Sequence, residues 1–192
     1  MKSKRNQPEY ESRQDQLKEL EKLQEQGYLQ LYYYDESGFS MTSALPYAWQ
    51  KKGQTIEVPA TKSNRINVAG LMNRAGDFHY QTHTGHITSK EIISLLDSFC
   101  VKLQQKTVVV VDNAPTHRSK AFLQKIKQWQ EQDLYIFFLP PYAPELNKIE
   151  ILWRKIKYQW LHFQAYLSWQ NLQGQLKYVL DNIGLKYILN FG

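Results

Sequence analysis

The chain has 192 residues, of which 42% are hydrophobic, and a formal net charge of +6 at pH 7. This content is enough for one substantial core and excludes a disordered chain. The single cysteine, Cys100, excludes a disulfide-stabilised scaffold and predicts a buried thiol in a reducing compartment. No stretch approaches the length of an apolar membrane span and the first residues lack an apolar core, so we expect a cytoplasmic protein without a membrane partner.

The first third of the chain predicts a helix followed by strands. Helix-forming residues cover 8–26, and Gly27 is expected to end the helix. Leucines recur every three residues in this helix, so we expect it to pack against the rest of the domain. An aromatic run, 28–34, predicts a strand, and Ser37-Gly38 predicts a tight turn into a second strand over 39–49.

Two more strands, 65–72 and 78–83, flank the turn-forming residues 73–76 and complete an antiparallel meander. Thr88 and Glu91 then stand at the spacing of a capping box. In a capping box the side chain of the first residue accepts from a backbone N–H in the first helical turn, and the side chain of the second residue accepts from the backbone N–H of the first. The pair therefore predicts the start of a helix.

The middle of the chain predicts a βαβ unit. The β-branched run 107–111 is typical of a strand buried on both faces, a helical stretch covers about 119–132, and a second apolar strand covers 134–139. Parallel strands joined in this way take a right-handed crossover. Ligands in such sheets bind beyond the carboxyl ends of the strands, where Asp112 lies.

Two helical segments, about 147–163 and 168–183, end the chain. The complete order predicts an α/β fold in which a mixed five-stranded sheet, an antiparallel meander plus parallel strands, is flanked by helices. This order matches the layout of the ribonuclease-H-like fold. In that layout the first strand lies beside the first parallel strand, so we expect Asp35 and Asp112 to converge although they are far apart in the sequence.

Three acidic residues occupy positions that a two-metal site would need. Asp35 follows the aromatic run, Asp112 follows the valine run, and Glu150 opens a basic, tryptophan-containing helix. Two divalent ions held by a few carboxylates can activate a water or a 3′-hydroxyl and stabilise a leaving oxygen, which is the chemistry of phosphodiester cleavage. Magnesium suits such a site because it prefers oxygen ligands.

Each acid also has a simpler interpretation. Asp35 and Asp112 precede turn-forming residues and could bond to their own backbone. Asn147 is a good N-cap residue, and Glu150 would then occupy the third helical position, where a carboxylate interacts favourably with the helix dipole. The residue types alone leave both interpretations open.

Three sequence blocks favour the metal site. The segment FLPPYAPELNKIEILWRKIK resembles the Pro-Tyr-Ser-Pro-x-Leu-Asn-Pro-Ile-Glu-x-x-Trp block of mariner-like transposases, in particular their bacterial insertion-sequence branch. VVVVDNAPTHRSK and YYYDESGFS are similar to the two aspartate blocks of that family. The resemblance implies a ribonuclease-H-like DDE endonuclease domain in which Asp35, Asp112 and Glu150 are the catalytic residues and the metal ligands.

The resemblance also divides the chain into an N-terminal helix or linker, residues 1–27, and a catalytic domain, residues 28–192. Two positions depart from the family pattern. Ala143 replaces a serine, and Lys148 replaces the proline before the Ile-Glu pair, which adds a cation beside the site. We expect neither change to abolish metal binding.

The family resemblance implies cut-and-paste movement of DNA, with metal-dependent strand cleavage, strand transfer and insertion at TA dinucleotides. The expected cofactors are two Mg²⁺ ions per site, with Mn²⁺ able to substitute. The expected partners are double-stranded DNA, as element ends and as target, a second copy of the chain on that DNA, and a separate helix-turn-helix subunit for end recognition. We expect such an enzyme to be bacterial and associated with the nucleoid.

Residues around the three acids supply further candidates. Asn113 and His117 belong to the second block and could orient Asp112 or contact a phosphate, with turn formation and helix capping as alternative roles. Glu36 and Glu145 also lie near the triad in sequence, but the family blocks exclude them as metal ligands. The expected DNA-binding residues are Lys52, Arg118, Lys120, Lys148, Arg154 and Lys157.

Two rival functions fit the same pattern. A ribonuclease or junction resolvase of the same fold would cut an RNA–DNA hybrid or branched DNA in preference to duplex DNA. A catalytically silent, DNA-binding fragment of a transposase would bind DNA tightly without metal-dependent cutting. The mild basic charge does not separate these functions, because it favours a polyanionic partner in every case.

Overall fold

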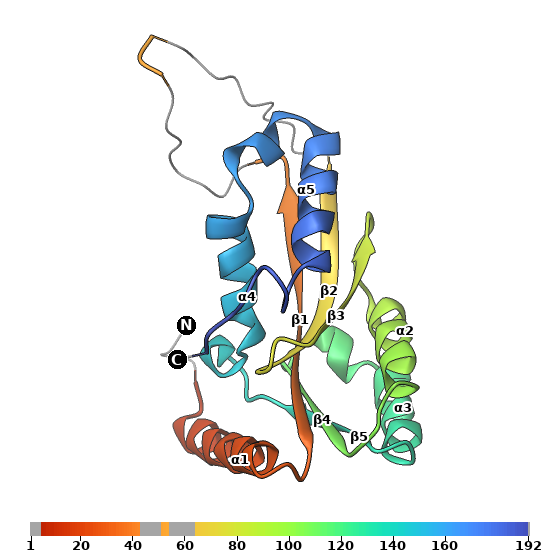
Figure 1. Ribbon diagram of the computed structural model, residues 1–192. Helices are drawn as coiled ribbons and strands as arrows, with labels where there is room; N and C mark the ends of the chain where they lie inside the picture. Colours follow the sequence, from red (N-terminus) through yellow and green to blue (C-terminus); the bar gives the residue numbers. More distant parts are fainter. Residues whose placement is uncertain (1–4, 43–50, 54–63, 192) are drawn as a thin grey trace.

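The structure is a computed structural model that describes residues 5–42, 51–53 and 64–191. Its strands are β1 (Gln30–Ser40), β2 (Arg65–Asn73), β3 (Phe78–His83), β4 (Thr107–Val111) and β5 (Leu134–Phe138). They form one five-stranded sheet in the order β3-β2-β1-β4-β5 (Figure 1). Strands β1, β2 and β3 pair antiparallel, whereas β1 with β4 and β4 with β5 pair parallel. The predicted mixed sheet is confirmed.

Helices cover both faces of this sheet. Within the described residues the α-helices are α1 (Gln7–Glu25), α2 (Ser89–Cys100), α3 (Lys120–Gln130), α4 (Ile149–Lys155) and α5 (Trp169–Asp181). Short 3-10 segments lie at Pro115–Arg118, Pro144–Leu146 and Phe163–Leu167. Helices α2 and α3 lie on one face, and α1, α4 and α5 lie on the other (Figure 1).

Alternation along β1 divides the core between the two faces. Tyr33 is buried in the cluster that includes α1, α4 and α5, whereas Tyr34 is buried in the cluster that includes α2 and α3. Successive side chains of a strand point to opposite faces. The next two residues, Asp35 and Glu36, therefore point toward α4 and toward the α3 side, respectively.

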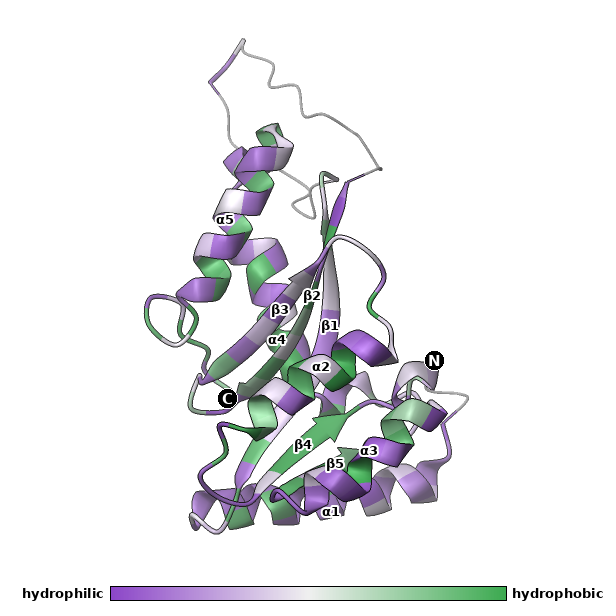
Figure 2. Ribbon diagram, turned by 90° about the vertical axis from the view of Figure 1, so that its right-hand side faces the viewer, coloured by the Kyte–Doolittle hydropathy of each residue, from purple (hydrophilic) through white to green (hydrophobic). Residues whose placement is uncertain are grey.

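The βαβ unit forms where the sequence predicts it. All five residues of β4 are buried, and its four valines make the strand hydrophobic over most of its length (Figure 2). A strand covered by helices on both faces requires such a run. The capping box is also present, because Thr88 Oγ1 accepts from the Lys90 backbone while the Glu91 carboxylate accepts from the Thr88 N–H at 2.8 Å.

Two predicted features of the meander differ from the structure. Ser37-Gly38 does not form a turn, because both residues lie inside β1 and pair with Val68 and Asn67 of β2. The strand predicted over 39–49 contributes only its first two residues to β1, and positions 43–50 lie outside the described residues. The pairing of β1 with β2 overrides the turn preference of Ser37-Gly38, because it satisfies the backbone N–H and C=O groups that a turn would otherwise satisfy.

The start and end of the helix predicted over 147–163 also differ. Asn147 is not the side-chain cap, since Lys148 occupies the N-cap position without a side-chain cap bond and Glu150 is the second helical residue. After α4 ends at Lys155, the chain continues as a π-helix over Ile156–Trp160. The apolar stripe remains buried at Ile149, Trp153 and Ile156.

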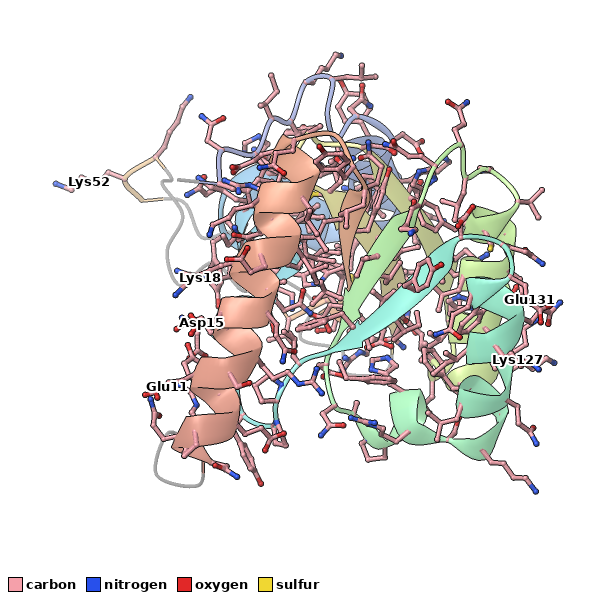
Figure 3. The ribbon with its side chains drawn as sticks, turned by 90° about the horizontal axis from the view of Figure 1, so that it is seen from below. Glu11, Asp15, Lys18, Lys52, Lys127 and Glu131 are labelled. Carbon is pink, nitrogen blue, oxygen red and sulfur yellow. The ribbon has the colours of Figure 1, made fainter. Side chains whose placement is uncertain are left out.

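Helix α1 packs against the sheet, as predicted. Tyr10 and Leu17 are buried in the core, whereas Glu11, Asp15 and Lys18 point away from it (Figure 3). The division of the chain after residue 27 stays a prediction. In the described part of the chain, no helix is both long and apolar enough to span a bilayer.

Candidate active site

Parallel pairing of β1 with β4 brings the two aspartates together. Tyr33 is the register partner of Val110, and Asp35 and Asp112 each follow two residues later. Asp112 follows the carboxyl end of β4, and Asp35 lies within β1 just beyond the last residue that pairs with β4. The predicted adjacency of the two strands is therefore found, and it brings the two carboxyl-bearing residues to one edge.

Helix α4 brings Glu150 to the same place. Asn147, just before the helix, is buried and its Nδ2 donates to the Tyr34 carbonyl at 2.9 Å, which ties the start of α4 to β1 beside Asp35. A cleft of about 440 Å³ lies at this junction. Its lining includes all three predicted acids, Asp35, Asp112 and Glu150, together with Asn113, Asn147 and the segment 139–144.

Asp35 sits in an apolar and negatively charged environment. Its Oδ2 accepts a hydrogen bond from Trp153 Nε1 at 3.1 Å. Burial, followed by the charge of Glu150, raises the pKa of Asp35 to about 8. Gly70 is its register partner on β2, and a Cβ there would lie 2.9 Å from the Trp153 ring, so the glycine makes room for the indole that holds Asp35.

Asp112 is held in a different way. Its Oδ1 accepts from His117 Nδ1 at 2.7 Å and from the Ala114 N–H at 2.9 Å. Burial alone would raise the pKa of Asp112, but these two hydrogen bonds lower it below its ordinary value. Within the described residues, no hydrogen bond engages Asp112 Oδ2, which leaves that oxygen for a ligand in the cleft.

Sequence reasoning missed a role for Glu36. The His117 ring is 1% exposed, and its Nε2 lies 3.5 Å from Glu36 Oε1, which also accepts from Tyr34 Oη at 2.7 Å. Burial disfavours the charged imidazole, but the hydrogen bond with Asp112 and the negative charge of Glu36 outweigh this effect and raise the pKa of His117 to about 9. The alternation of side chains along β1 could have shown this role, because Glu36 faces away from Asp35 and toward the segment VVVVDNAPTHRSK, which contains His117.

We expect Glu36→Gln to lower the pKa of His117 by about one pH unit, because the substitution removes one of the two carboxylates that stabilise the imidazolium. An NMR titration of the His117 ring measures this value directly. Glu131→Gln, at the exposed end of α3 (Figure 3), is the control and should leave the titration unchanged. An unchanged titration in Glu36→Gln would contradict the role of Glu36.

The other predicted residues occupy different surroundings. Asn113 lines the cleft, and its Oδ1 accepts from Arg118 Nε, whose guanidinium lies 3.9 Å from the centre of the Phe138 ring. Lys120 is exposed at the first turn of α3. Lys52 lies in the 52–53 turn, which projects from the body of the molecule (Figure 3).

The three predicted cations near α4 are not equivalent. Lys148 pairs with Glu21 of α1 at 2.6 Å, so its charge is directed into the protein. Arg154 is exposed. Lys157 is half-buried above the Phe39 ring; burial lowers its pKa, and the charges of Glu150 and Asp35 act in the opposite direction. The structure therefore brings Lys157 close to the acids.

The chemistry of the cleft fits a divalent cation. Three carboxyl-bearing residues line it, and Asn147 Oδ1 is buried without a hydrogen-bond partner among the described residues. Hard cations prefer such oxygen ligands. As the side chains stand, no group of three or more His, Cys, Asp or Glu residues in the described chain is arranged to hold a metal ion.

Comparison of the fold with solved structures finds transposase and integrase cores. The Mos1 transposase paired-end complex with left transposon end superposes with a TM-score of 0.62 at 15% identity, covering 92% of this chain and 55% of that chain. The catalytic domain of Mos1 mariner transposase gives a TM-score of 0.58 at 14% identity, covering 92% and 82%. The catalytic core domain of BIV integrase gives 0.52 at 13%, covering 85% and 88%.

These likenesses establish the fold of the chain as that of ribonuclease-H-like transposase and integrase cores, and the chain spans just over half the length of the full Mos1 chain. No curated protein matches the sequence. The family model described as DDE superfamily endonuclease matches residues 30–173, which is well over half of the chain and includes all three acids. The chain therefore belongs to the DDE superfamily of endonucleases.

Proposed function

We propose that this chain is the catalytic domain of a mariner-like DNA transposase, which cleaves DNA strands and transfers them to a target. The observation that carries the proposal is the meeting of Asp35, Asp112 and Glu150 in one cleft, beside the point where the parallel pairing of β1 with β4 ends. Membership of the DDE endonuclease family supports the same function. In this proposal residues 28–192 are the catalytic domain.

The three acids would hold two Mg²⁺ or Mn²⁺ ions, which supply activation of a water or 3′-hydroxyl and stabilisation of the leaving oxygen when bound. Asp35 would contribute to both ion sites, Asp112 to one and Glu150 to the other. His117 fixes one oxygen of Asp112, and Trp153 fixes one oxygen of Asp35.

Cations beside the cleft would bind the DNA backbone. The charges of Glu150 and Asp35 act on Lys157, Lys120 is exposed at the start of α3, and Arg154 is exposed on α4. Phosphate contacts of this kind fix the register of DNA without reading its sequence. Element-end recognition would then come from a separate helix-turn-helix region, with two copies of the chain acting on two ends and insertion at TA.

Lys120→Met is expected to weaken duplex binding and to reduce the salt dependence of the binding constant by about one phosphate contact. Fluorescence anisotropy at several salt concentrations measures the slope. Lys102→Met is a matched control, since Lys102 is exposed beyond α2 and lines a different cavity from the proposed site. Equal salt-dependence slopes for the two variants would show that Lys120 makes no phosphate contact.

A plasmid assay tests the proposed function. The purified chain is incubated with supercoiled plasmid and Mn²⁺, beside an RNA–DNA hybrid and a four-way junction at the same concentration. Metal-dependent nicking of the plasmid is expected to exceed cutting of the other two substrates. Preferred cutting of the hybrid would indicate a ribonuclease, and preferred cutting of the junction a resolvase. Tight DNA binding with no cutting of any substrate would indicate a silent fragment.

A further inference from the structure

Helix α1 contacts the loop that precedes α4 at the side of the candidate site. Near the end of the helix, Glu21 Oε1 accepts from Lys148 Nζ at 2.6 Å and from Tyr33 Oη at 2.8 Å. The side chains of Glu21 and Lys148 are only 18% and 24% exposed. Hydrogen bonds from Lys148 and Tyr33 outweigh burial and lower the pKa of Glu21. A shielded, charge-assisted pair of this kind is stronger than a surface pair.

A second contact lies just before α1 begins. The Arg5 guanidinium donates to the Tyr142 carbonyl at 2.7 Å and pairs with Glu145 at 2.5 Å. Its side chain is 8% exposed and lies 4.0 Å from the centre of the Tyr10 ring. Arg5 therefore joins the N-terminal end of α1 to the beginning of the same loop.

The segment between these two contacts forms a wall of the cleft. Tyr142, Ala143, Pro144 and Asn147 all line the cleft beside Glu150. Tyr142 has a φ of 59°, which is uncommon for a residue other than glycine and persists only where the surroundings hold it. The Arg5 bond to the Tyr142 carbonyl is a restraint at that position.

We propose that α1 is a brace that positions residues 142–148, and through them Glu150, so that Arg5 and Glu21 are positioning residues for the reaction. The proposal rests on the proposed function, since it assigns α1 a part in assembling that site. On the outward side of α1, the charged side chains of Glu11, Asp15 and Lys18 are exposed to solvent (Figure 3). The pair of Glu21 with Lys148 is different, because it joins α1 to Lys148, which lies two residues before Glu150.

Hydrogen–deuterium exchange of the full chain tests the brace without reference to activity. We expect Glu21→Gln and Lys148→Met each to speed exchange of amides 142–150 by about tenfold, because each removes a charge-assisted bond at low exposure. Lys148→Arg should retain most of the protection. Glu19→Gln is the matched control: it breaks the exposed 2.7 Å pair with Lys22 on the same helix and should leave this exchange unchanged.

The metal dependence of nicking is the second readout. A displaced Glu150 should raise the Mn²⁺ concentration that gives half-maximal rate by about tenfold, with a smaller loss at saturating Mn²⁺, and Lys148→Arg should restore the wild-type midpoint. Unchanged exchange in both Glu21→Gln and Lys148→Met would overturn the brace. If the wild type cuts no DNA, the proposed function fails, while the exchange comparison still decides whether α1 restrains the loop.

Discussion

Asp112→Asn is expected to abolish metal-dependent nicking while leaving the fold intact. A bound divalent ion contributes several kcal/mol of transition-state stabilisation, so loss of a ligand should slow the reaction by about 10³-fold or more. The asparagine Oδ1 can still accept the hydrogen bonds that His117 Nδ1 and the Ala114 N–H give to the aspartate. The fold should therefore survive, which circular dichroism and a thermal melt of the variant will show.

Asp15→Asn is the control for this comparison, because Asp15 is exposed on the outward side of α1 (Figure 3). Its nicking rate should equal that of the wild type. If Asp112→Asn nicks DNA at a rate near that of the control, Asp112 is not a metal ligand. The proposal that Asp35 and Asp112 hold an ion together would then be wrong.

Asp35→Asn is expected to stabilise the metal-free protein at pH 9 by on the order of 2 to 5 kcal/mol relative to wild type, and by much less at pH 5. Burial and the charge of Glu150 raise the pKa of Asp35 to about 8. Between its ordinary value near 4 and this value, the folded protein binds a proton that the unfolded chain has lost. The free energy of unfolding of the wild type therefore falls as pH rises through that window.

Urea unfolding in the presence of a chelator, at intervals from pH 5 to pH 9, measures this effect. The difference between wild type and Asp35→Asn isolates the group, because the other titrating residues are present in both proteins. The asparagine side chain introduced by the substitution can keep an acceptor for Trp153 Nε1, so the indole should not lose its partner. If the difference in the free energy of unfolding between the two proteins does not change with pH, the pKa of Asp35 is not raised by burial and by the charge of Glu150.

Much of the fold follows from local sequence signals. The β-branched run of β4 and the capping box of α2 form as predicted, because each depends on residues next to one another in the chain. The convergence of Asp35 and Asp112 is expected from the ribonuclease-H-like layout, in which the first strand lies beside the first parallel strand, and the pairing of β1 with β4 agrees with it. The candidate site is predictable to this extent.

The remaining features depend on contacts between distant segments. Gly38 stays in β1 because the strand pairs with β2, where Asn67 is the register partner of Gly38. The contact of Glu36 with His117 needs the register of β1 against β4. The pairing of Glu21 with Lys148 needs the position of α1 on the sheet. None of these partners is encoded in the spacing of neighbouring residues.

Manganese binding in crystals of the full chain tests the central claim most directly, because anomalous scattering locates the ion without reference to activity. We predict manganese peaks in the cleft, one between Asp35 and Asp112 and one between Asp35 and Glu150, with His117 still bonded to Asp112. A cleft without manganese, at an ion concentration that supports nicking, would contradict a metal site formed by these three residues.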